Sequence, residues 1–306
     1  MNTIIESDKE ESSIAAVCHP CVINQTRSAA RFAELTEEQT EKVINVVNVW
    51  LDESKKTPLL VQHIVRYAAD AIIQEHGESL DFDIYAEVKK KSNLLAISYA
   101  KGFQKKIDDS DTPLEVGMQI AAAGNIIDFG AIDHTSLNLD EELRLLDKTP
   151  FAHYDIEAYI EILGKASLLL YICDNSGEIV FDMLFIKEIE RAYPNLQIIA
   201  AVRGKPIIND ATLKDAKAVK LDRLVTTISS GSVYPGTILP ETTEEFQELY
   251  ASADVILSKG QGNLETLLPI ADKRVFFLLR IKCELMASVA KVRKDSLVLM
   301  QGSKFK

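Results

Sequence analysis

The sequence predicts an α/β protein: a three-layer α/β/α sandwich with a mainly parallel sheet, preceded by an all-helical domain. Up to about residue 150, apolar residues recur at the spacing of amphipathic helices. Beyond residue 155, short apolar runs alternate with helical segments, which is typical of a parallel sheet covered on both faces. The 306 residues are 47% hydrophobic and 26% charged, enough for about two globular domains.

Four helical segments are expected in the first half of the chain. The first starts at Thr36, which can cap a helix, and the fourth follows Pro113, which suits a first turn. Their apolar stripes are Val43–Trp50, Leu59–Ile72, Ile84–Ala100 and Leu114–Ala123. We predict a flexible tail over residues 1–17, a mainly helical domain over 18–150 and an α/β/α domain over 151–306.

The second half is expected to form a sheet of buried strands. The clearest strand is Ser167–Cys173, a continuous apolar run that suits burial on both faces. Helices are expected over Gly177–Tyr193 and Thr242–Ala251. The remaining expected strands are Leu196–Val202, Arg223–Ile228, Asp254–Ser258, Arg274–Leu279 and Ser296–Met300.

The overall charge argues against several classes of partner. With 46 acidic and 34 basic residues, the net charge of −12 repels nucleic-acid backbones on average. The first residues lack the pattern of a signal peptide, and no apolar run approaches the roughly 20 residues of a membrane helix. Four cysteines are too few for a disulfide framework. We therefore expect a cytoplasmic protein with neither nucleic acid nor membrane as partner.

Polar and glycine-rich segments follow the predicted strands. In open α/β sheets, ligands bind beyond the carboxyl ends of the strands, so these segments are expected to meet. Carboxylate and amide oxygens suit a hard divalent ion, whereas lysine, arginine and backbone N–H groups suit phosphate. The segments are Asp174–Glu178, Arg203–Asp210, Ser229–Ser232, Lys259–Asn263, and Arg280 with Lys282.

Each segment also has an ordinary structural explanation. Asp174 and Asp210 are placed to cap the helices that follow them, and Lys259–Gly262 suits a tight turn. The convergence of all these segments at one sheet edge favours a site. Common phosphate-binding and hydrolase signatures are missing, since no P-loop and no Gly-x-Ser-x-Gly elbow occurs. Cys18 and Cys21 form a single Cys-x-x-Cys motif without the second pair of a structural zinc site, so packing is expected there.

Four motifs in this order resemble those of the metal-dependent damage-control phosphatases. The closest likeness is to their archaeal and bacterial branch, whose members often begin with a Cys-x-x-Cys segment. The same family includes the protein-glutamate methyltransferase-like sugar phosphate phosphatases. The resemblance runs from about Cys18 to Met300 and implies a helical domain joined to an α/β/α domain. The motifs are Gly124–Asp128, Asp174–Glu178, Arg203–Thr212 and Lys259–Asn263.

The resemblance implies a phosphatase that acts on a small phosphorylated metabolite, either a sugar phosphate or a damaged phospho-metabolite. It implies a divalent ion, Mg²⁺, Mn²⁺ or Ni²⁺/Co²⁺, bound by Asp174, Asn175 and Asp210. The substrate is expected to face Asn125, Asp128, Lys259 and Asn263.

Charge considerations add roles for the neighbouring residues. Lys259 is expected to offset phosphate charge, and Asp174 either binds the metal that holds the attacking water or is itself the nucleophile. The N–H groups of Ser176 and Gly177, at a helix start, are expected to add donors.

Three further residues are expected to contact the substrate or its surroundings. Gly260 lies in the glycine-rich turn after a strand. Glu178 either orients water or a metal ligand, or is simply an acid in a first helical turn. Arg203 either clamps the substrate or pairs with an acid in its loop.

Two other functions fit the same residues. A non-catalytic sensor of a sugar phosphate needs the same constellation. An S-adenosylmethionine-dependent protein carboxyl methyltransferase is the second alternative, although a methyl donor has no need of an oxygen-ligand triad. The sequence leaves open the natural substrate, the preferred metal and the oligomeric state.

Overall fold

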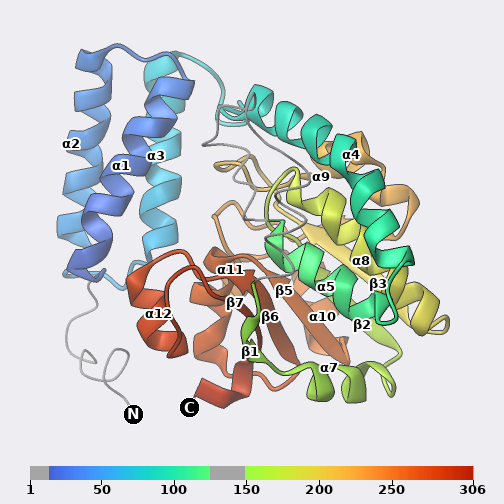
Figure 1. Ribbon diagram of the computed structural model, residues 1–306. Coiled ribbons are helices and arrows are strands. Elements are labelled where there is room, and N and C mark those ends of the chain that lie inside the picture. The colour runs from blue at the N-terminus through green and yellow to red at the C-terminus, as the bar shows by residue number, and fades with distance from the viewer. Residues whose placement is uncertain (1–13, 125–148, 306) are drawn as a thin grey trace. The chain divides into compact units, whose positions relative to one another are not determined.

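A computed structural model describes residues 14–124 and 149–305 (Figure 1). Two of the expected substrate-facing residues, Asn125 and Asp128, lie outside the described residues. The chain forms two compact units. The first unit holds the residues up to Ala86 together with Lys205–Ile208 and Val233–Pro235, and the second holds the remainder.

The helices of the first unit pack through their apolar faces, which bury Val47 and Ile64. Thr36 and Gln39 form a capping box at the start of the second helix. The third helix ends at Gly77, which adopts the left-handed conformation (φ +85°). The three helices are α1 (His19–Phe32), α2 (Glu37–Glu53) and α3 (Val61–His76).

The boundary between the two units lies near residue 86, not near residue 150 as predicted. Helices α4 (Ala86–Asp108) and α5 (Pro113–Ala123) belong almost entirely to the second unit. Their apolar residues belong to the core on one face of the sheet, where the ring centroids of Phe103 and Phe181 lie 5.1 Å apart. Helical periodicity shows that such a segment is a helix but does not show which core it covers.

The second unit is built on one seven-stranded sheet, in the order β1-β7-β6-β5-β2-β3-β4. Neighbouring strands are parallel except β6 and β7, so β1 and β7 run opposite to the other five. The strands are β1 (Phe151–Tyr154), β2 (Leu168–Ile172), β3 (Gln197–Val202), β4 (Thr226–Ser229), β5 (Val255–Lys259), β6 (Val275–Arg280) and β7 (Leu297–Gln301).

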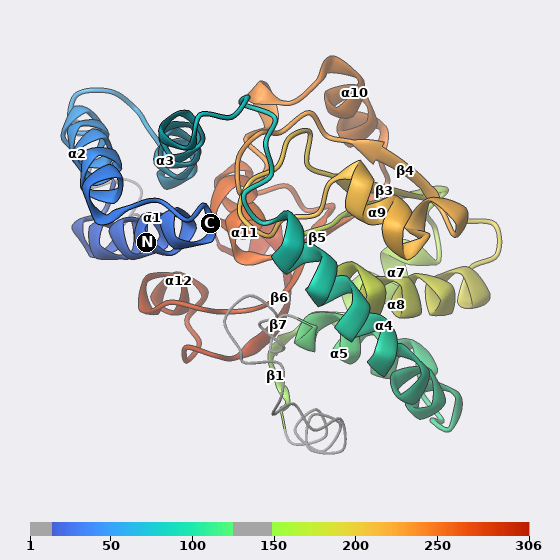
Figure 2. The ribbon, with the colours of Figure 1, turned by 90° about the horizontal axis from the view of Figure 1, so that it is seen from above.

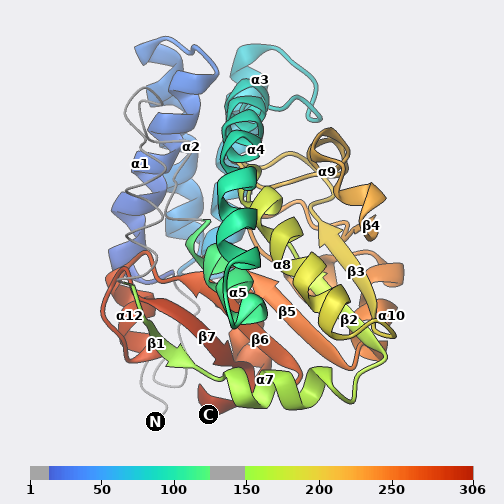
Figure 3. The ribbon, with the colours of Figure 1, turned by 45° about the vertical axis from the view of Figure 1, so that its right-hand side comes forward.

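Helices cover both faces of this sheet, and two separate apolar cores result. One face packs against α4 and α5 and against α7 (Ile156–Leu163), α8 (Glu178–Ala192) and α9 (Leu213–Val219), as Figure 3 shows for α5 and α8. The other face packs against α10 (Glu244–Ser252), α11 (Gln261–Leu267) and α12 (Glu284–Ala290). In Figure 2 the sheet lies between α10 and the helices α4 and α5.

The predicted fold class is confirmed: the protein is an α/β/α sandwich with a mainly parallel sheet and an N-terminal helical region. All six expected strands are present within a few residues. Strand β1 was not expected, because its four residues are alternately half-buried and exposed and give only a weak pattern. No helix in the described ranges is long and apolar enough to cross a membrane.

Candidate metal and phosphate site

The sheet has a topological switch point between β2 and β5. From β2 the chain continues to β3 and β4 on one side, and β5 then lies on the other side of β2. Ligands of open α/β sheets bind beyond the strand ends at such a point. Asp174 and Asn175 follow β2 after one intervening residue, and Gly260 follows β5 directly. The predicted motifs therefore meet where this fold places its ligand site.

A short antiparallel bridge brings the predicted metal ligands together. Asn175 and Asp210 pair as bridge partners, and the N–H of Ala211 donates to the carbonyl oxygen of Asp174 over 2.7 Å. Both loops follow neighbouring parallel strands, β2 and β3, whose carboxyl ends lie at the same sheet edge. The backbone itself therefore holds Asp174, Asn175 and Asp210 next to one another.

Neither aspartate serves as a helix cap. The N-cap of α8 is Gly177, three residues after Asp174, and no side chain caps that helix. The N-cap of α9 is Thr212, which forms a capping box with Asp215. The capping explanation for Asp174 and Asp210 is thus wrong, and their burial needs another explanation.

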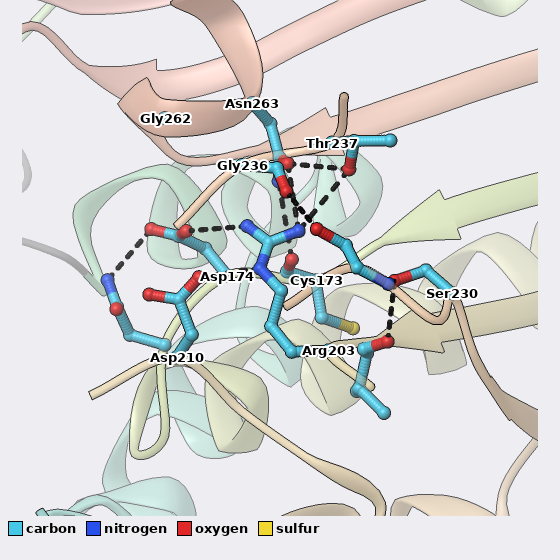
Figure 4. Close-up of polar contacts among 12 residues, drawn as sticks. Cys173, Asp174, Arg203, Asp210, Ser230, Gly236, Thr237, Gly262 and Asn263 are labelled. Atoms are coloured by element: carbon cyan, nitrogen blue, oxygen red, sulfur yellow. Dashed lines mark hydrogen bonds and ion pairs between the residues drawn. The ribbon is translucent and has the colours of Figure 1, made fainter. Parts of the chain in front are cut away.

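Arg203 lies against both carboxylates and is only 2% exposed. Its Nε is 2.6 Å from Asp210 Oδ2, and its Nη2 is 3.7 Å from Asp174 Oδ1. Its Nη1 donates to Asn263 Oδ1 over 3.0 Å and to Thr237 Oγ1 over 3.3 Å, as Figure 4 shows. Of the two roles considered for Arg203, the structure displays the pairing with an acid of its own loop.

The three predicted ligands each keep one oxygen available. Asp174 Oδ2 accepts from Asn175 Nδ2 over 2.8 Å, and Asp210 Oδ2 accepts from Arg203. Among the described residues, no donor lies within hydrogen-bond distance of the second oxygen of either carboxylate or of Asn175 Oδ1. Three oxygens of this kind form a ligand set suited to Mg²⁺ or Mn²⁺.

The buried charges around these oxygens do not balance. Four carboxylates face two cations, which leaves an excess of two negative charges when all six are ionised. Burial, followed by repulsion from Asp210 and Glu178, raises the pKa of Asp174 well above its ordinary value. Burial also raises the pKa of Asp210, although Arg203 opposes the change. A divalent cation would neutralise the excess, so the residues present fit one. The six groups are Asp174, Glu178, Asp182, Arg203, Asp210 and Lys259.

The ligand set contains only two acids, since its third member is an amide. Accordingly, residues 14–124 and 149–305 contain no cluster of three His, Cys, Asp or Glu side chains arranged to hold a metal. Cys18 and Cys21 lie at the start of α1 in the first unit, half-buried and exposed respectively. Their role stays a prediction.

Lys259 is placed differently from the expectation that it faces substrate. Its ammonium is fully buried and donates to Glu178 Oε1 (2.7 Å), Asp182 Oδ1 (2.6 Å) and the carbonyl oxygen of Ala121 (2.9 Å). Burial alone would lower the pKa of Lys259, but the two carboxylates raise it overall. All three ammonium hydrogens are used, which leaves none for a phosphate oxygen.

The alternation of side chains along β5 explains this direction. Val255 and Leu257, four and two residues before Lys259, lie in the core between the sheet and α8. Residues two apart in a strand point to the same face, so Lys259 points into that core too. The position of a lysine at a strand end is therefore not enough to predict that it reaches the crevice.

Gly260 contacts Asp174 and has no room for a side chain. Its φ of +83° disfavours other residues, and a Cβ built on it would overlap the Asp174 carboxyl group. The close approach of the β5–α11 turn is what holds that carboxylate in place. Gly260 thus supports a proposed ligand residue, and the expected contact of Gly260 with substrate stays a prediction.

The backbone N–H groups expected to bind phosphate are already engaged. The N–H of Gly177 donates to Asn93 Oδ1 over 2.7 Å, and that of Ser176 donates to the carbonyl oxygen of Asn209 over 2.9 Å. The expectation that Ser176 and Gly177 supply donors to a substrate is therefore wrong for this arrangement.

Asn263 and Glu178 are also buried in contacts within the chain. Asn263 Nδ2 donates to the carbonyl oxygen of Lys259 over 2.6 Å, and its Oδ1 accepts from Arg203. Glu178 accepts from Lys259 and, over 3.3 Å, from Asn175 Nδ2. Asn263 therefore contacts Arg203, and Glu178 contacts the proposed ligand Asn175. A direct contact of either residue with substrate stays a prediction.

Lys282 belongs to one of the strand-end segments predicted to meet at the site, but no role was predicted for it. It lies two residues beyond the end of β6, is exposed, and its backbone N–H donates to Gln261 Oε1 over 2.7 Å. Its charge lowers the pKa of both Asp174 and Asp210, so it lies within electrostatic range of the two carboxylates. The sequence feature that points to a site role for Lys282 is its position just after β6, a strand of the central sheet.

Asp182 and Tyr171 were also missed. The Tyr171 hydroxyl donates to Asp182 Oδ1 over 2.6 Å, and both residues are fully buried. Burial raises the pKa of Asp182 to about 6, against the attraction of Lys259. The available signal was the spacing of Glu178 and Asp182, two acids four residues apart in the otherwise apolar first half of the helix.

Known proteins resemble this chain in sequence and in fold over most of their length. The pattern of the damage-control phosphatase ARMT1-like domain matches residues 14–298. A damage-control phosphatase of Pyrococcus horikoshii is 33% identical over 279 residues, which cover 88% of this chain and 95% of the relative. An uncharacterized protein of Methanocaldococcus jannaschii is 32% identical over 300 residues, covering 93% and 94%.

Structural comparison agrees. The crystal structure of a DUF89 family protein from Pyrococcus horikoshii superimposes with a TM-score of 0.82 and 30% identity, covering 94% of this chain and 99% of that one. A damage-control phosphatase of Archaeoglobus fulgidus is 29% identical over 279 residues, covering 90% and 94%. With its sequence pattern, its fold and its strand-end motifs in agreement, this chain belongs to the damage-control phosphatase ARMT1-like family.

Proposed function

We propose that this protein is a divalent-metal-dependent phosphatase acting on small phosphorylated metabolites in the cytoplasm. The observation that carries the proposal is the group of Asp174, Asn175 and Asp210 at the switch point of the sheet, beside an excess of buried negative charge. Membership in the family supports the phosphatase role. The metal and the substrate class are the parts that we add.

Asp174, Asn175 and Asp210 would hold the ion through one oxygen each. When bound, a divalent ion supplies Lewis-acid polarisation of the phosphate and lowers the pKa of a coordinated water. Arg203 fixes the Asp210 carboxylate through Nε, and Gly260 keeps Asp174 in place. These contacts spare the carboxylates the loss of side-chain freedom on binding, which favours affinity.

Lys282 is the cation that we propose for the substrate phosphate, in place of Lys259. It is exposed, and its charge already acts on the carboxylates of Asp174 and Asp210. An ammonium at this point can meet a phosphate oxygen without leaving a buried partner unpaired.

The Lys282→Met variant should lose about a hundredfold in kcat/KM for a phosphate ester, because one charged contact in the transition state is worth about 3 kcal/mol. Mn²⁺ affinity should stay within a few-fold of the wild type, and Lys282→Arg should recover part of the rate. Lys273→Met is the matched control, since exposed Lys273 precedes the same strand at its opposite end. Equal rates for both methionine variants would contradict the role of Lys282.

The metal-free protein should become more stable as pH falls from neutrality. The raised pKa of Asp174 means that the native state keeps a proton which the unfolded chain, with the ordinary pKa of 3.8, has released. Acidification therefore favours the native state until that lower value is reached. The raised pKa values of Asp182 and Asp210 act in the same direction.

Metal binding should release protons for the same reason, and the apparent affinity for Mn²⁺ should rise as the pH is raised through the elevated pKa of Asp174. Calorimetric titration in two buffers of different ionisation enthalpy measures the number of protons released. A dissociation constant that does not change with pH would contradict the shifted carboxyl groups.

The proposal is tested by release of inorganic phosphate from a panel of phosphate esters. Each ester is incubated with metal-stripped protein plus Mg²⁺, Mn²⁺, Ni²⁺ or Co²⁺, and in parallel with chelator. We expect turnover of at least one small ester with an added metal and none with chelator. Full activity in chelator would contradict metal dependence, and metal-dependent binding of an ester without turnover would indicate a sensor instead.

A further inference from the structure

A chain of buried polar contacts lies behind the candidate site. The Tyr171 hydroxyl and the Lys259 ammonium both donate to Asp182 Oδ1, each over 2.6 Å. Lys259 donates in turn to Glu178 Oε1 over 2.7 Å, and Glu178 Oε2 accepts from Asn175 Nδ2 over 3.3 Å. Within this series of contacts, every residue except Asn175 is at most 1% exposed, so none of those four side chains can reach a substrate.

The orientation of the Asn175 amide depends on this chain. Nδ2 donates to Asp174 Oδ2 and to Glu178 Oε2, so both amide hydrogens point at carboxylates. An ionised carboxylate only accepts hydrogen bonds. With both acids ionised, as a bound divalent cation requires, a turned-over amide would point its oxygen at two negatively charged groups. The two carboxylates therefore select the orientation in which Asn175 Oδ1 is the atom left to bind a cation.

Glu178 can orient the Asn175 amide only if its own carboxylate is held in place. Both its oxygens are used, one by Asn175 and the other by Lys259. The ammonium is fixed by two more contacts, to Asp182 and to the carbonyl oxygen of Ala121. An ammonium with three fixed acceptors in the protein interior cannot move without leaving a buried charge unpaired, which is costly.

These residues lie in regular secondary structure of the central sheet and of a helix packed on it. Tyr171 lies in β2, Lys259 ends β5, and these two strands are neighbours in the sheet. Glu178 and Asp182 lie one turn apart on α8, which packs on the same sheet face. The chain of contacts thus connects the strand that precedes Asp174 with the helix that follows it.

We propose that Asp182 and Lys259 are positioning residues that act through Glu178 to orient the amide of Asn175 toward a divalent cation, with Tyr171 supporting Asp182. This inference rests on the proposed metal site for the role of Asn175. Groups behind a metal ligand orient it, and their loss typically weakens metal affinity by about tenfold to a hundredfold.

The experiment measures the dissociation constant for Mn²⁺ by calorimetry and the thermal midpoint in chelator, on metal-stripped full-length protein. Asp182→Asn has the same shape as the wild-type side chain but removes one anion from Lys259, and we expect about tenfold weaker Mn²⁺ binding. Tyr171→Phe removes only the hydroxyl donor, and we expect a loss of about threefold. If Asp182→Asn does not fold, Tyr171→Phe decides the outcome.

Glu188→Gln is the matched control. Glu188 is a buried acid on the same helix, ten residues after Glu178, and it forms an ion pair with Arg191 outside the chain of contacts. We expect this variant to lower the midpoint without changing the Mn²⁺ dissociation constant.

A purely structural role would lower the midpoint of all three variants and leave their Mn²⁺ dissociation constants equal to that of the wild type. That result would overturn the inference while leaving the proposed function intact. Failure of the wild type itself to bind Mn²⁺ would overturn both. Weaker binding in the Asp182 and Tyr171 variants, with unchanged binding in the Glu188 control, is the result we expect.

Discussion

Asp174→Asn should lower phosphate-ester hydrolysis by at least about a hundredfold while leaving the protein folded. The substitution removes a negative charge from the proposed metal site but keeps the size of the side chain. In chelator the thermal midpoint should stay level or rise, because Asp174 and Asp210 repel each other when no cation lies between them. Phosphate release with Mn²⁺ and the midpoint in chelator are measured on the same preparation.

Asp155→Asn is a suitable control for this variant. Asp155 occupies the N-cap position of α7, and its carboxylate accepts from the N–H of Gln301 over 2.8 Å, a contact outside the site. We expect a small change in its midpoint and wild-type activity. If Asp174→Asn also keeps full turnover, Asp174 has no part in binding the metal.

Gly260→Ala should be far more damaging than its small volume suggests. The backbone at Gly260 has φ +83°, and the added methyl group would overlap the Asp174 carboxyl group. With ψ +154°, this backbone lies in a region that is essentially restricted to glycine, and another residue there costs about 1–3 kcal/mol. Displacing the carboxylate adds about 1–3 kcal/mol, the usual cost of overpacking, and moves a metal ligand. We expect Mn²⁺ binding and hydrolysis to be lost together.

Gly77→Ala separates these two effects. Gly77 shares the positive φ (+85°), although its ψ of +19° places it in the left-handed helical region, and a Cβ there meets nothing within 4 Å. The control should therefore lose only about 1–2 kcal/mol to backbone strain and keep both metal binding and activity. Equal losses of Mn²⁺ affinity in the two variants would show that contact with Asp174 is not the reason for glycine at position 260.

The sequence was sufficient to predict the sheet and the residues gathered at its edge. Buried parallel strands are continuous apolar runs, and their carboxyl ends meet, so the positions of Asp174 and Asp210 after β2 and β3 place them together. Side-chain direction was harder to predict. Lys259 follows the same strand-end pattern, yet the alternation along β5 turns it into the core next to α8.

Contacts between residues distant in the sequence were also not predicted. The predicted donors at Ser176 and Gly177 are used by Asn209 and Asn93, residues distant in the sequence, and no local pattern reveals such partners. The unit boundary near residue 86 has the same cause, because amphipathic α4 and α5 cover the sheet while their sequences resemble those of the preceding helices.

The central claim is that Asp174, Asn175 and Asp210 bind a divalent cation. Calorimetric titration of the metal-stripped protein with Mn²⁺, compared with the Asp174→Ala, Asp210→Ala double variant, tests it most directly. We predict saturable binding by the wild type and none by the double variant, which should still unfold cooperatively in chelator. Binding of equal strength by the two proteins would contradict the assignment of the site.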